Sequence, residues 1–391
     1  MSLELIRYQP MPPIYTQEHL LFQDSVRRFC AAEILPSLTS WEEKRFFPNE
    51  LFPKLGAQGF LGIFVDEQWG GVSGDYLMAG AWCEEFGRVP AVGLTTGVNM
   101  HSLVVAAAVN RFGSGEAKEQ WLQRAVAGTA IGAYAFTEPG VGSDLFNLKT
   151  KAVPDGDYFI INGAKTFITN GARADFIIAL TRTSHDKGYG GFTTFVIDTK
   201  TPGFKVNRTL SKIGWHSSDT AELSFTDMRI HKSMVLGTFD HGWYHAMSSL
   251  EWERLMLTLG ALGGARECLE KTVTYVNDRG VFGASIGSYN HTRELLASLW
   301  AKLETGRALA HHCLDLLQGG KRCRKEVSLA KLFVCELAVE VADRCLQLHG
   351  GYGYTTEFLP ERWLRDLRLN PIGGGTSEIM ANVVAKDLRL L

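Results

Sequence analysis

The sequence lacks the short motifs that identify several large enzyme classes. Among its 391 residues, no GxGxxG run follows an expected strand, and neither GxxxxGK[ST] nor HExxH occurs. Those patterns mark Rossmann dinucleotide-binding domains, phosphate-binding loops and zinc metalloproteases. The adjacent His311 and His312 lie in an expected helix and point two ways, so we predict surface or packing roles and no metal site.

Paired cysteines and an excess of one charge are absent as well. The seven cysteines are odd in number and include no CxxC pair, which favours a reducing compartment. The 40 basic and 42 acidic residues give a formal net charge of -2, and no basic run is present. This composition gives no indication of nucleic acid as a partner.

Long apolar runs are scarce: we expect that no stretch approaches the length of a membrane span. Residues 1–8 contain no signal-peptide core. The cytoplasm is therefore the expected location, and the mitochondrial matrix is the alternative if a transit peptide has been removed. The hydrophobic share of 45% is ample for cores in two or three domains.

Hydrophobic spacing divides the chain into three consecutive parts: an all-α domain (1–130), an antiparallel β domain (131–240) and a helical-bundle domain (241–391). This is an α+β architecture with the classes in series. Apolar spacing of three and four predicts helices over 17–32, 48–58, 76–87, 98–112, 117–127, 292–318 and 325–349. Alternating, β-branched stretches predict strands over 131–136, 158–162, 176–181, 193–198, 203–206 and 221–226.

The stretch 248–257, SSLEWERLML, opens a long helical pattern and contains a candidate general base, Glu253. On a helix its neighbours one turn away are small or apolar, namely Ser249, Leu250, Met256 and Leu257. A carboxylate there loses hydration, so its pKa rises towards the range that suits a base. The alternative is a glutamate at the edge of the core, paired with Arg254 or a partner chain.

A second candidate site is the loop 134–144, YAFTEPGVGSD. Its glycines expose backbone N–H groups, and Thr137 and Ser143 add hydroxyls, which together suit a phosphate or the polar edge of a planar ring. A simple turn is the alternative. The segment closely resembles the flavin-binding signature of acyl-CoA dehydrogenases, and this resemblance assigns Phe136, Thr137 and Ser143 to FAD and Ser143 also to the substrate.

The resemblance covers nearly the whole chain and implies that the C-terminal domain is a four-helix bundle. The stretch 163–171, GAKTFITNG, is similar to the second flavin segment of the family, which places Phe167 against the isoalloxazine ring and Thr169 at flavin N5. The stretch 278–283, DRGVFG, resembles an element whose arginine, here Arg279, clamps the pyrophosphate of FAD held mainly by another subunit. The family commonly has Gln eleven residues later, where this chain has Asn290.

Two C-terminal stretches complete the resemblance: 347–354, QLHGGYGY, and 371–380, PIGGGTSEIM. The family pattern implies FAD contacts at Gln347, Gly350, Gly351, Thr376 and Glu378. It places the Gly374 and Gly375 amides towards the substrate, which consecutive glycines permit because they allow close backbone approach. Arg254 either meets the substrate or pairs with Glu251.

Most family members carry their catalytic Glu at the position of Gly374. A subgroup that includes isovaleryl- and long-chain acyl-CoA dehydrogenases carries it on the helix, immediately before an Arg, and Glu253-Arg254 resembles that arrangement. The implied reaction is α,β-dehydrogenation of an acyl-CoA to the 2-enoyl-CoA, with Glu253 removing the α proton and FAD N5 accepting the β hydride. An electron-transferring flavoprotein as acceptor and a homotetramer are implied as well.

Gly373 stands where many straight-chain enzymes have Tyr, which favours a short or branched acyl group unless Trp252, Met100 or another bulky residue fills the space. Two other functions remain open. The absence of a carboxylate at Gly374 is compatible with a flavin oxidase or N-hydroxylase of the same fold that uses oxygen. A flavin-free helical interaction protein is the other reading.

Overall fold

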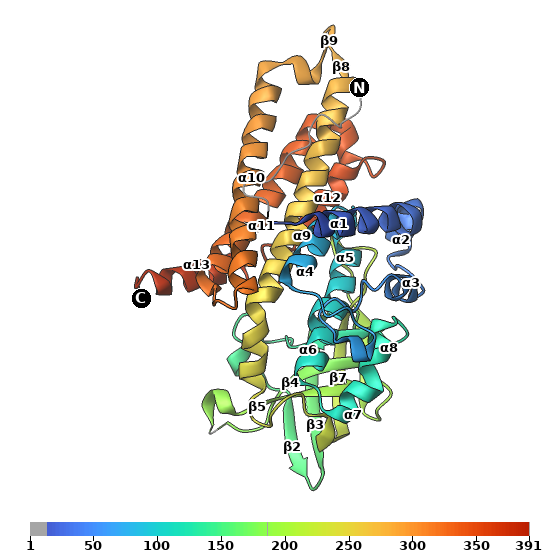
Figure 1. Cartoon of the computed structure of the whole chain (residues 1–391), viewed down its shortest axis with the longest axis vertical. Helices are drawn as coiled ribbons and strands as arrows, with labels where there is room; N and C mark the ends of the chain where they lie inside the picture. The colour runs from blue at the N-terminus through green and yellow to red at the C-terminus, as the bar shows by residue number, and fades with distance from the viewer. Residues whose placement is uncertain (1–13, 186, 391) are drawn as a thin grey trace.

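The computed structural model describes residues 14–185 and 187–390. Residues 1–8, for which the sequence predicts no signal-peptide core, lie outside the described part. The molecule is elongated, with a β-sheet at one end, long helices at the other and shorter helices packed beside their junction (Figure 1). The order helical, β, helical agrees with the fold class expected from the sequence.

The N-terminal part is helical. Its α-helices are α1 (Gln17–Phe29), α2 (Leu38–Lys44), α3 (Leu51–Ala57), α4 (Tyr76–Phe86), α5 (Val92–Asn99), α6 (Ala107–Phe112), α7 (Gly115–Ala117) and α8 (Gln123–Val126). A π-helical stretch, Met100–Ala106, joins α5 to α6. The sequence predicted this helix only from residue 98, because the buried residues of α5 carry no amphipathic pattern.

The expectation that no stretch approaches a membrane span was wrong for this helix. Val92–Phe112 is long and apolar enough by length and composition, in the part of the chain that the structure describes. Its most apolar window is 83% buried within the molecule. That burial explains the composition, because a helix covered on all sides by protein is apolar all round.

The middle part forms one seven-stranded sheet in the order β1-β4-β2-β3-β7-β6, with β5 paired to β4. The strands are β1 (Gly132–Ala135), β2 (Lys151–Asp155), β3 (Tyr158–Thr169), β4 (Phe176–Arg182), β5 (Phe192–Asp198), β6 (Phe204–Thr209) and β7 (Thr220–His231). Most pairs are antiparallel, as expected, but β1 and β2 both run parallel to β4. Strand β2 was not predicted, because Pro154 and the largely exposed residues around it have the composition of a turn.

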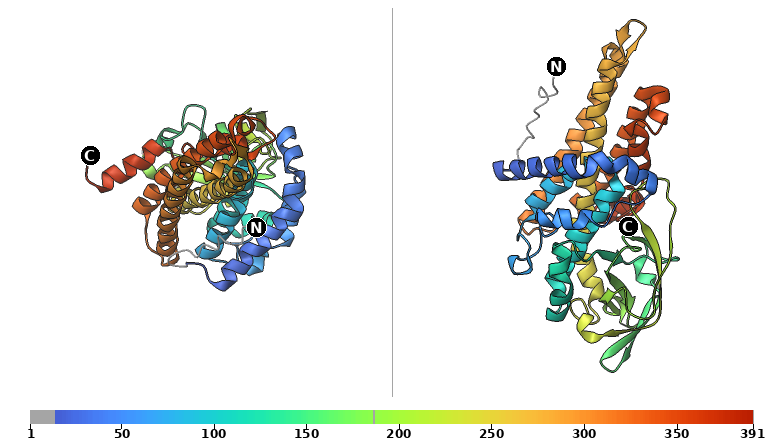
Figure 2. Two further views of the ribbon diagram at one scale, coloured as in Figure 1. Left: turned by 90° about the horizontal axis from the view of Figure 1, so that it is seen from above. Right: turned by 90° about the vertical axis from the view of Figure 1, so that its right-hand side faces the viewer.

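The C-terminal part contains three long helices, α9 (Gly242–Asp278), α10 (Asn290–Gln318) and α11 (Arg324–His349), which pack pairwise. The shorter α12 (Leu359–Leu367) packs against α9 and α11, and α13 (Ser377–Asp387) packs against α11. A hairpin of β8 (Gly280–Val281) and β9 (Ala284–Ser285) connects α9 to α10. Figure 2 shows this hairpin at the end of the molecule opposite the sheet.

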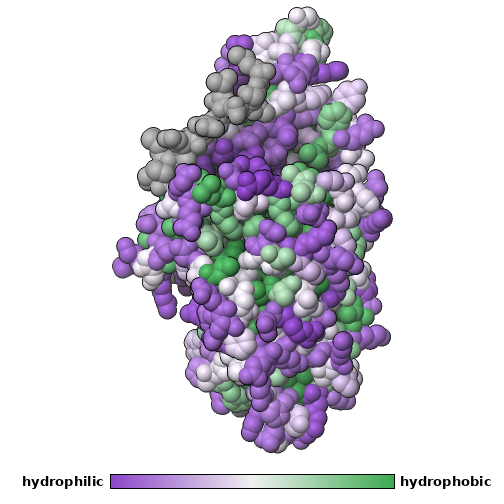
Figure 3. All heavy atoms as spheres, turned by 45° about the vertical axis from the view of Figure 1, so that its right-hand side comes forward, coloured by the Kyte–Doolittle hydropathy of each residue, from purple (hydrophilic) through white to green (hydrophobic). Residues whose placement is uncertain are grey.

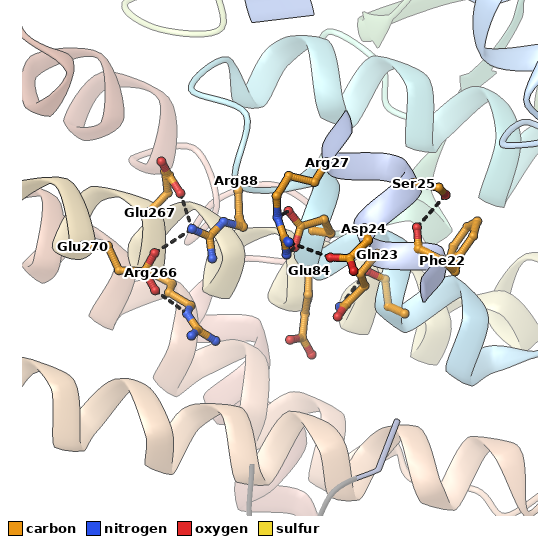
Figure 4. Close-up of polar contacts among 12 residues, drawn as sticks. Phe22, Gln23, Asp24, Ser25, Arg27, Glu84, Arg88, Arg266, Glu267 and Glu270 are labelled. Atoms are coloured by element: carbon orange, nitrogen blue, oxygen red, sulfur yellow. Dashed lines mark hydrogen bonds and ion pairs between the residues drawn. The ribbon is translucent and has the colours of Figure 1, made fainter. Parts of the chain in front are cut away.

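Arginine–glutamate pairs fix the first part of the chain to α9. Arg88, which follows α4, lies 2.5 Å from Glu267 and 2.6 Å from Glu270. Arg266 approaches the same Glu270 at 2.8 Å (Figure 4). Arg27 of α1 binds Glu85 of α4 through two nitrogens, each at 2.9 Å. Because these groups are partly buried, the pairs hold α1, α4 and α9 in a fixed arrangement.

Asp366 of α12 joins three segments that are far apart in sequence. Its fully buried carboxyl accepts hydrogen bonds from Val92 N, at the start of α5, at 3.0 Å and from Trp215 N at 2.5 Å. The Trp215 indole donates to the Asp366 carbonyl at 2.9 Å. Asp366 thereby connects both helical parts to the loop that precedes β7.

Asp366→Asn is expected to lower the free energy of unfolding by about 2–3 kcal/mol. The amide group retains one acceptor oxygen but presents an N–H₂ group to a second backbone N–H donor. Denaturant unfolding of the purified protein measures the change. The exposed Asp343→Asn on α11 is the control and should change stability by less than about 0.5 kcal/mol. Equal stability of the two variants would contradict this role for Asp366.

Candidate active site

Glu253 lies in the N-terminal half of α9 (Gly242–Asp278), the helix whose first turns adjoin the sheet (Figure 1). Ser249, one turn earlier, places its Oγ 2.5 Å from Glu253 Oε1. Tyr134 approaches the same carboxyl from β1, and its hydroxyl favours the ionised form. The carboxyl therefore sits where the middle and C-terminal parts of the chain meet.

Burial raises the pKa of Glu253 to about 7. The Ser249 hydroxyl, the Arg254 charge and the Tyr134 hydroxyl oppose this shift because each favours the ionised carboxylate. The result is a carboxyl poised near neutral pH, as a general base requires.

Arg254 is buried and contacts the glycine loop 373–375. Its Nε donates to the Gly374 carbonyl at 3.3 Å. The sequence left a pair with Glu251 open, but Glu251 accepts hydrogen bonds from Cys323 N, at 3.0 Å, immediately before α11. Arg254 therefore supports the backbone of the loop, and Glu251 binds the residue that precedes α11.

Lys331 of α11 also binds the backbone of this loop. Its Nζ donates to the carbonyls of Asn370 at 3.0 Å and Gly375 at 2.7 Å, and only 1% of the residue is exposed. Gly374 and Gly375 have φ values of 66° and 102°, a region that residues with a Cβ rarely adopt. Two cationic side chains thus fix a backbone conformation that depends on glycine.

Leu257 occupies the space beside Gly374. A Cβ placed on Gly374 would lie 2.6 Å from Leu257 Cδ1. Leu257 is four residues after Glu253 and therefore on the same face of α9, so Gly374 lies one helical turn from the carboxyl. Trp252 packs elsewhere, with ring centroids 5.1 Å from Phe64 and 5.4 Å from Tyr76.

The two segments that resemble flavin-binding motifs lie together. Lys165 of β3 is fully buried and donates to the Phe136 carbonyl at 3.0 Å and to Glu138 at 2.9 Å. Glu138 also accepts hydrogen bonds from the N–H groups of Lys149 and Thr150. Thr137 adds a hydrogen bond from its hydroxyl to the Thr166 carbonyl. The loop after β1 is therefore rigidly attached to β3.

Phe167 provides a surface that fits a planar ring. It lies where the register of β3 against β7 shifts, with φ 61°, and 70% of the residue is exposed. An exposed phenylalanine in left-handed backbone is strained, and such strain concentrates at functional sites. Thr169, two residues later, pairs with Thr220 of β7. An apolar ring held outward beside a hydroxyl matches the needs of an isoalloxazine.

Five predicted cofactor residues lie far from Glu253: Arg279, Asn290, Gln347, Gly350 and Gly351. Glu253 and Arg279 are separated by about 39 Å along α9, at 1.5 Å per residue. All five are exposed, and Arg279 lies over Tyr352 at 5.6 Å. Asn290 donates to Glu294 at 2.9 Å at the start of α10. The clamp on the FAD of another subunit stays a prediction.

Three predicted contact residues remain: Thr376, Glu378 and Ser143. Thr376 caps α13 by accepting a hydrogen bond from Ile379 N at 3.3 Å. Glu378 is exposed, and its hydrogen bond with Thr376 lowers its pKa. Ser143 is exposed in the loop after β1. All three are available to a bound group.

Sequence reasoning did not assign functions to Tyr134, Lys165, Lys331 or Leu257, and it treated Ser249 only as a small neighbour of Glu253. Lysine within an apolar stretch, as in GAKTFI and SLAKLF, was the available signal for the two buried lysines. Long-range contacts decide the other roles, because Tyr134 is more than 100 residues from Glu253 in sequence.

The order of domains and the residues of the site resemble those of one enzyme family. The sequence matches three domain families: "Acyl-CoA dehydrogenase, N-terminal domain" at 16–129, "middle domain" at 133–228 and "C-terminal domain" at 240–389. Long-chain specific acyl-CoA dehydrogenase of Sus scrofa mitochondria is 37% identical over 96% of this chain and 87% of its own length.

Two solved structures extend the comparison. Acyl-CoA dehydrogenase from Geobacillus kaustophilus has a TM-score of 0.92 and 36% identity, covering 96% of this chain and 98% of its own. A glutaryl-CoA dehydrogenase from Mycobacterium smegmatis in complex with FADH2 has a TM-score of 0.93 and 31% identity, covering 100% and 98%. The chain belongs to the acyl-CoA dehydrogenase family. It is an FAD-dependent oxidoreductase, so the flavin-free reading is withdrawn.

Proposed function

We propose that this enzyme oxidises an acyl-CoA to the 2-enoyl-CoA with Glu253 as the catalytic base, as in the isovaleryl and long-chain types of the family. The observation that carries the proposal is the Glu253 carboxyl, with its pKa raised by burial to about 7, one helical turn from the glycine loop. The loop position that holds Glu in most members is Gly374, so this chain offers its carboxylate from α9 instead.

In this mechanism Glu253 removes the proton from the carbon next to the thioester. The developing negative charge on the thioester oxygen needs hydrogen-bond donors, and the Gly374 amide is the donor supplied by the chain. One such donor is worth roughly 3 kcal/mol in the transition state. Arg254 and Lys331 hold the carbonyls of this loop, which keeps its amides in place. FAD, when bound, accepts the hydride from the β carbon.

The residues that fit FAD are Phe136, Thr137, Phe167, Thr169 and Ser143 of one chain, with Thr376 and Glu378. Arg279, Asn290, Gln347, Gly350 and Gly351 would contact the FAD of a second chain. Two exposed aromatic residues support an assembly. Phe282, at the tip of the hairpin between α9 and α10, is 100% exposed, and Tyr354, in the 3-10 turn after α11, is 85% exposed. Figure 3 also shows hydrophobic residues gathered in the middle of one face. We propose a homotetramer.

An electron-transferring flavoprotein is the proposed acceptor, by family resemblance, and the cytoplasm the proposed location. The preference for a short or branched acyl chain remains a prediction. Its basis was the space left at Gly373, where an added Cβ would meet only the Leu369 carbonyl oxygen at 3.7 Å, whereas Leu257 fills the space beside Gly374. Relatives are named for long, short and short/branched chains.

Anaerobic bleaching of the flavin by straight, branched and cyclic acyl-CoAs tests this function and the chain-length preference together. Bleaching by at least one acyl-CoA, with formation of its 2-enoyl product, is the expected result. Rapid substrate-dependent oxygen uptake without an added acceptor would instead favour the oxidase or N-hydroxylase function. Failure of every acyl-CoA to bleach the flavin would reject the proposal.

The rate of this half-reaction should rise with pH and reach half its plateau near pH 7. A base must be ionised to accept a proton, and Glu253 is protonated below its raised pKa. Each pH unit below about 6 should therefore reduce kcat/KM about tenfold. Stopped-flow bleaching from pH 5 to pH 9 measures the profile, and a flat profile over that range would contradict a base with this pKa.

A further inference from the structure

Two hydroxyl groups from different parts of the chain meet at the Glu253 carboxyl. Ser249 Oγ lies 2.5 Å from Glu253 Oε1 and 3.0 Å from the Ala246 carbonyl oxygen. The Tyr134 hydroxyl lies near both side chains and favours the ionised form of Glu253. Ser249 and Glu253 are fixed relative to each other by α9, whereas Tyr134 comes from β1.

The serine hydroxyl has one hydrogen and two lone pairs, so it donates to one of its two neighbours at a time. When Glu253 is ionised, the hydrogen belongs on the carboxylate, because a charged acceptor makes the shorter and stronger bond. When Glu253 is protonated, its O–H donates to Ser249 Oγ, and the serine hydrogen turns to the Ala246 carbonyl. Every polar hydrogen then has an acceptor before and after proton transfer.

We propose that Ser249 and Tyr134 are positioning residues that hold the Glu253 carboxyl in one orientation in both of its protonation states. This inference rests on the proposed role of Glu253 as base. The proton taken from the substrate breaks its bond to carbon and stays on Glu253, and neither hydroxyl gains or loses a proton. Their effect is to keep the carboxyl directed at the substrate without a side-chain rotation in the reaction.

The two hydroxyls also affect the pKa of Glu253. Both favour the carboxylate, so removing either one leaves the effect of burial less opposed. The charged groups around Glu253 are Arg254 on the same helix, with Glu251 and Arg324 beyond it and Lys331 below the glycine loop. None of these changes in a Ser249 or Tyr134 variant, so the effect of each hydroxyl can be measured separately.

The test compares Ser249→Ala and Tyr134→Phe with the parent enzyme. In each variant the apparent pKa of kcat/KM should rise by about one pH unit, because one hydroxyl that favours the charged carboxylate is lost. Activity at pH 6 should fall about tenfold and recover above pH 9. Ser249→Thr keeps a hydroxyl and should restore the parent profile.

Ser248→Ala is the matched control. Ser248 is exposed on the same turn, and its hydroxyl donates to the His245 carbonyl at 2.7 Å, so its loss should leave the profile unchanged. A purely structural role for Ser249 would lower thermal stability or flavin content without moving the pKa. Profiles of Ser249→Ala and Tyr134→Phe that superimpose on the parent profile would overturn the proposal. A shift in one variant alone would remove the other residue from it.

Infrared titration of the carboxyl C=O stretch supplies a second readout that needs no turnover. The band that disappears in Glu253→Gln reports the base, and its midpoint should rise in both hydroxyl variants. If Glu253→Gln proved fully active, the proposed function would fail while the infrared midpoints still tested the hydroxyl contacts. If Glu253→Gln is inactive and the midpoints do not move, only the present inference fails.

Discussion

Glu253→Gln should reduce the rate of flavin bleaching by acyl-CoA about 10³- to 10⁴-fold, the upper range for loss of a general base. Glutamine has nearly the same shape, and its amide oxygen still accepts a hydrogen bond from Ser249, so the site should keep its structure. An amide cannot accept the substrate proton at neutral pH. The loss should therefore appear in the rate of reduction, while acyl-CoA binding, measured by its perturbation of the flavin spectrum, changes little.

Glu251→Gln is the control for this substitution. Glu251 lies two residues earlier on α9, and its carboxyl accepts a hydrogen bond from Cys323 N, which the glutamine oxygen can also accept. Its rate should stay within about threefold of the parent enzyme. Rates in Glu253→Gln that match those of Glu251→Gln would remove Glu253 from the mechanism and return attention to the glycine loop.

Lys331→Met should lower the free energy of unfolding by about 2–4 kcal/mol, because two buried carbonyls lose their donor. Methionine fills much of the same volume, so a cavity contributes little. The glycine loop should then move relative to α9, and a displacement of about 1 Å at a reacting group can reduce kcat/KM about 10²-fold. Thermal unfolding and stopped-flow bleaching measure the two effects.

Lys302→Met provides the matched comparison. Lys302 on α10 pairs with Glu340 at 2.7 Å, and its side chain is 43% exposed. Its loss should change stability by less than about 0.5 kcal/mol and leave the rate unchanged. A Lys331→Met enzyme with the parent's stability and rate would show that Arg254 and the glycines hold the loop without the lysine.

The spacing of apolar residues along the sequence was enough to predict most of the fold. It changes from helical to alternating near residue 131 and back near 242, and the order of structural classes follows from that. The missed elements are those whose pattern is not periodic: α5 is buried on all sides, and β2 contains Pro154 in an exposed hairpin. The parallel pairing of β1 with β4 also escaped prediction, because pairing depends on how the chain crosses between strands.

For the site, the sequence by itself supplied residue types at fixed spacing: a glutamate on an apolar helix face, glycines where the backbone must approach a ligand, and an aromatic residue beside a threonine. Only the tertiary structure decided which of these lie together. It brings Tyr134 and Ser249 to Glu253, puts Lys331 and Arg254 on the glycine loop, and places Arg279 about 39 Å from the base along α9. Contacts between segments more than 100 residues apart arise from tertiary packing, and the spacing of residues within either segment does not predict them.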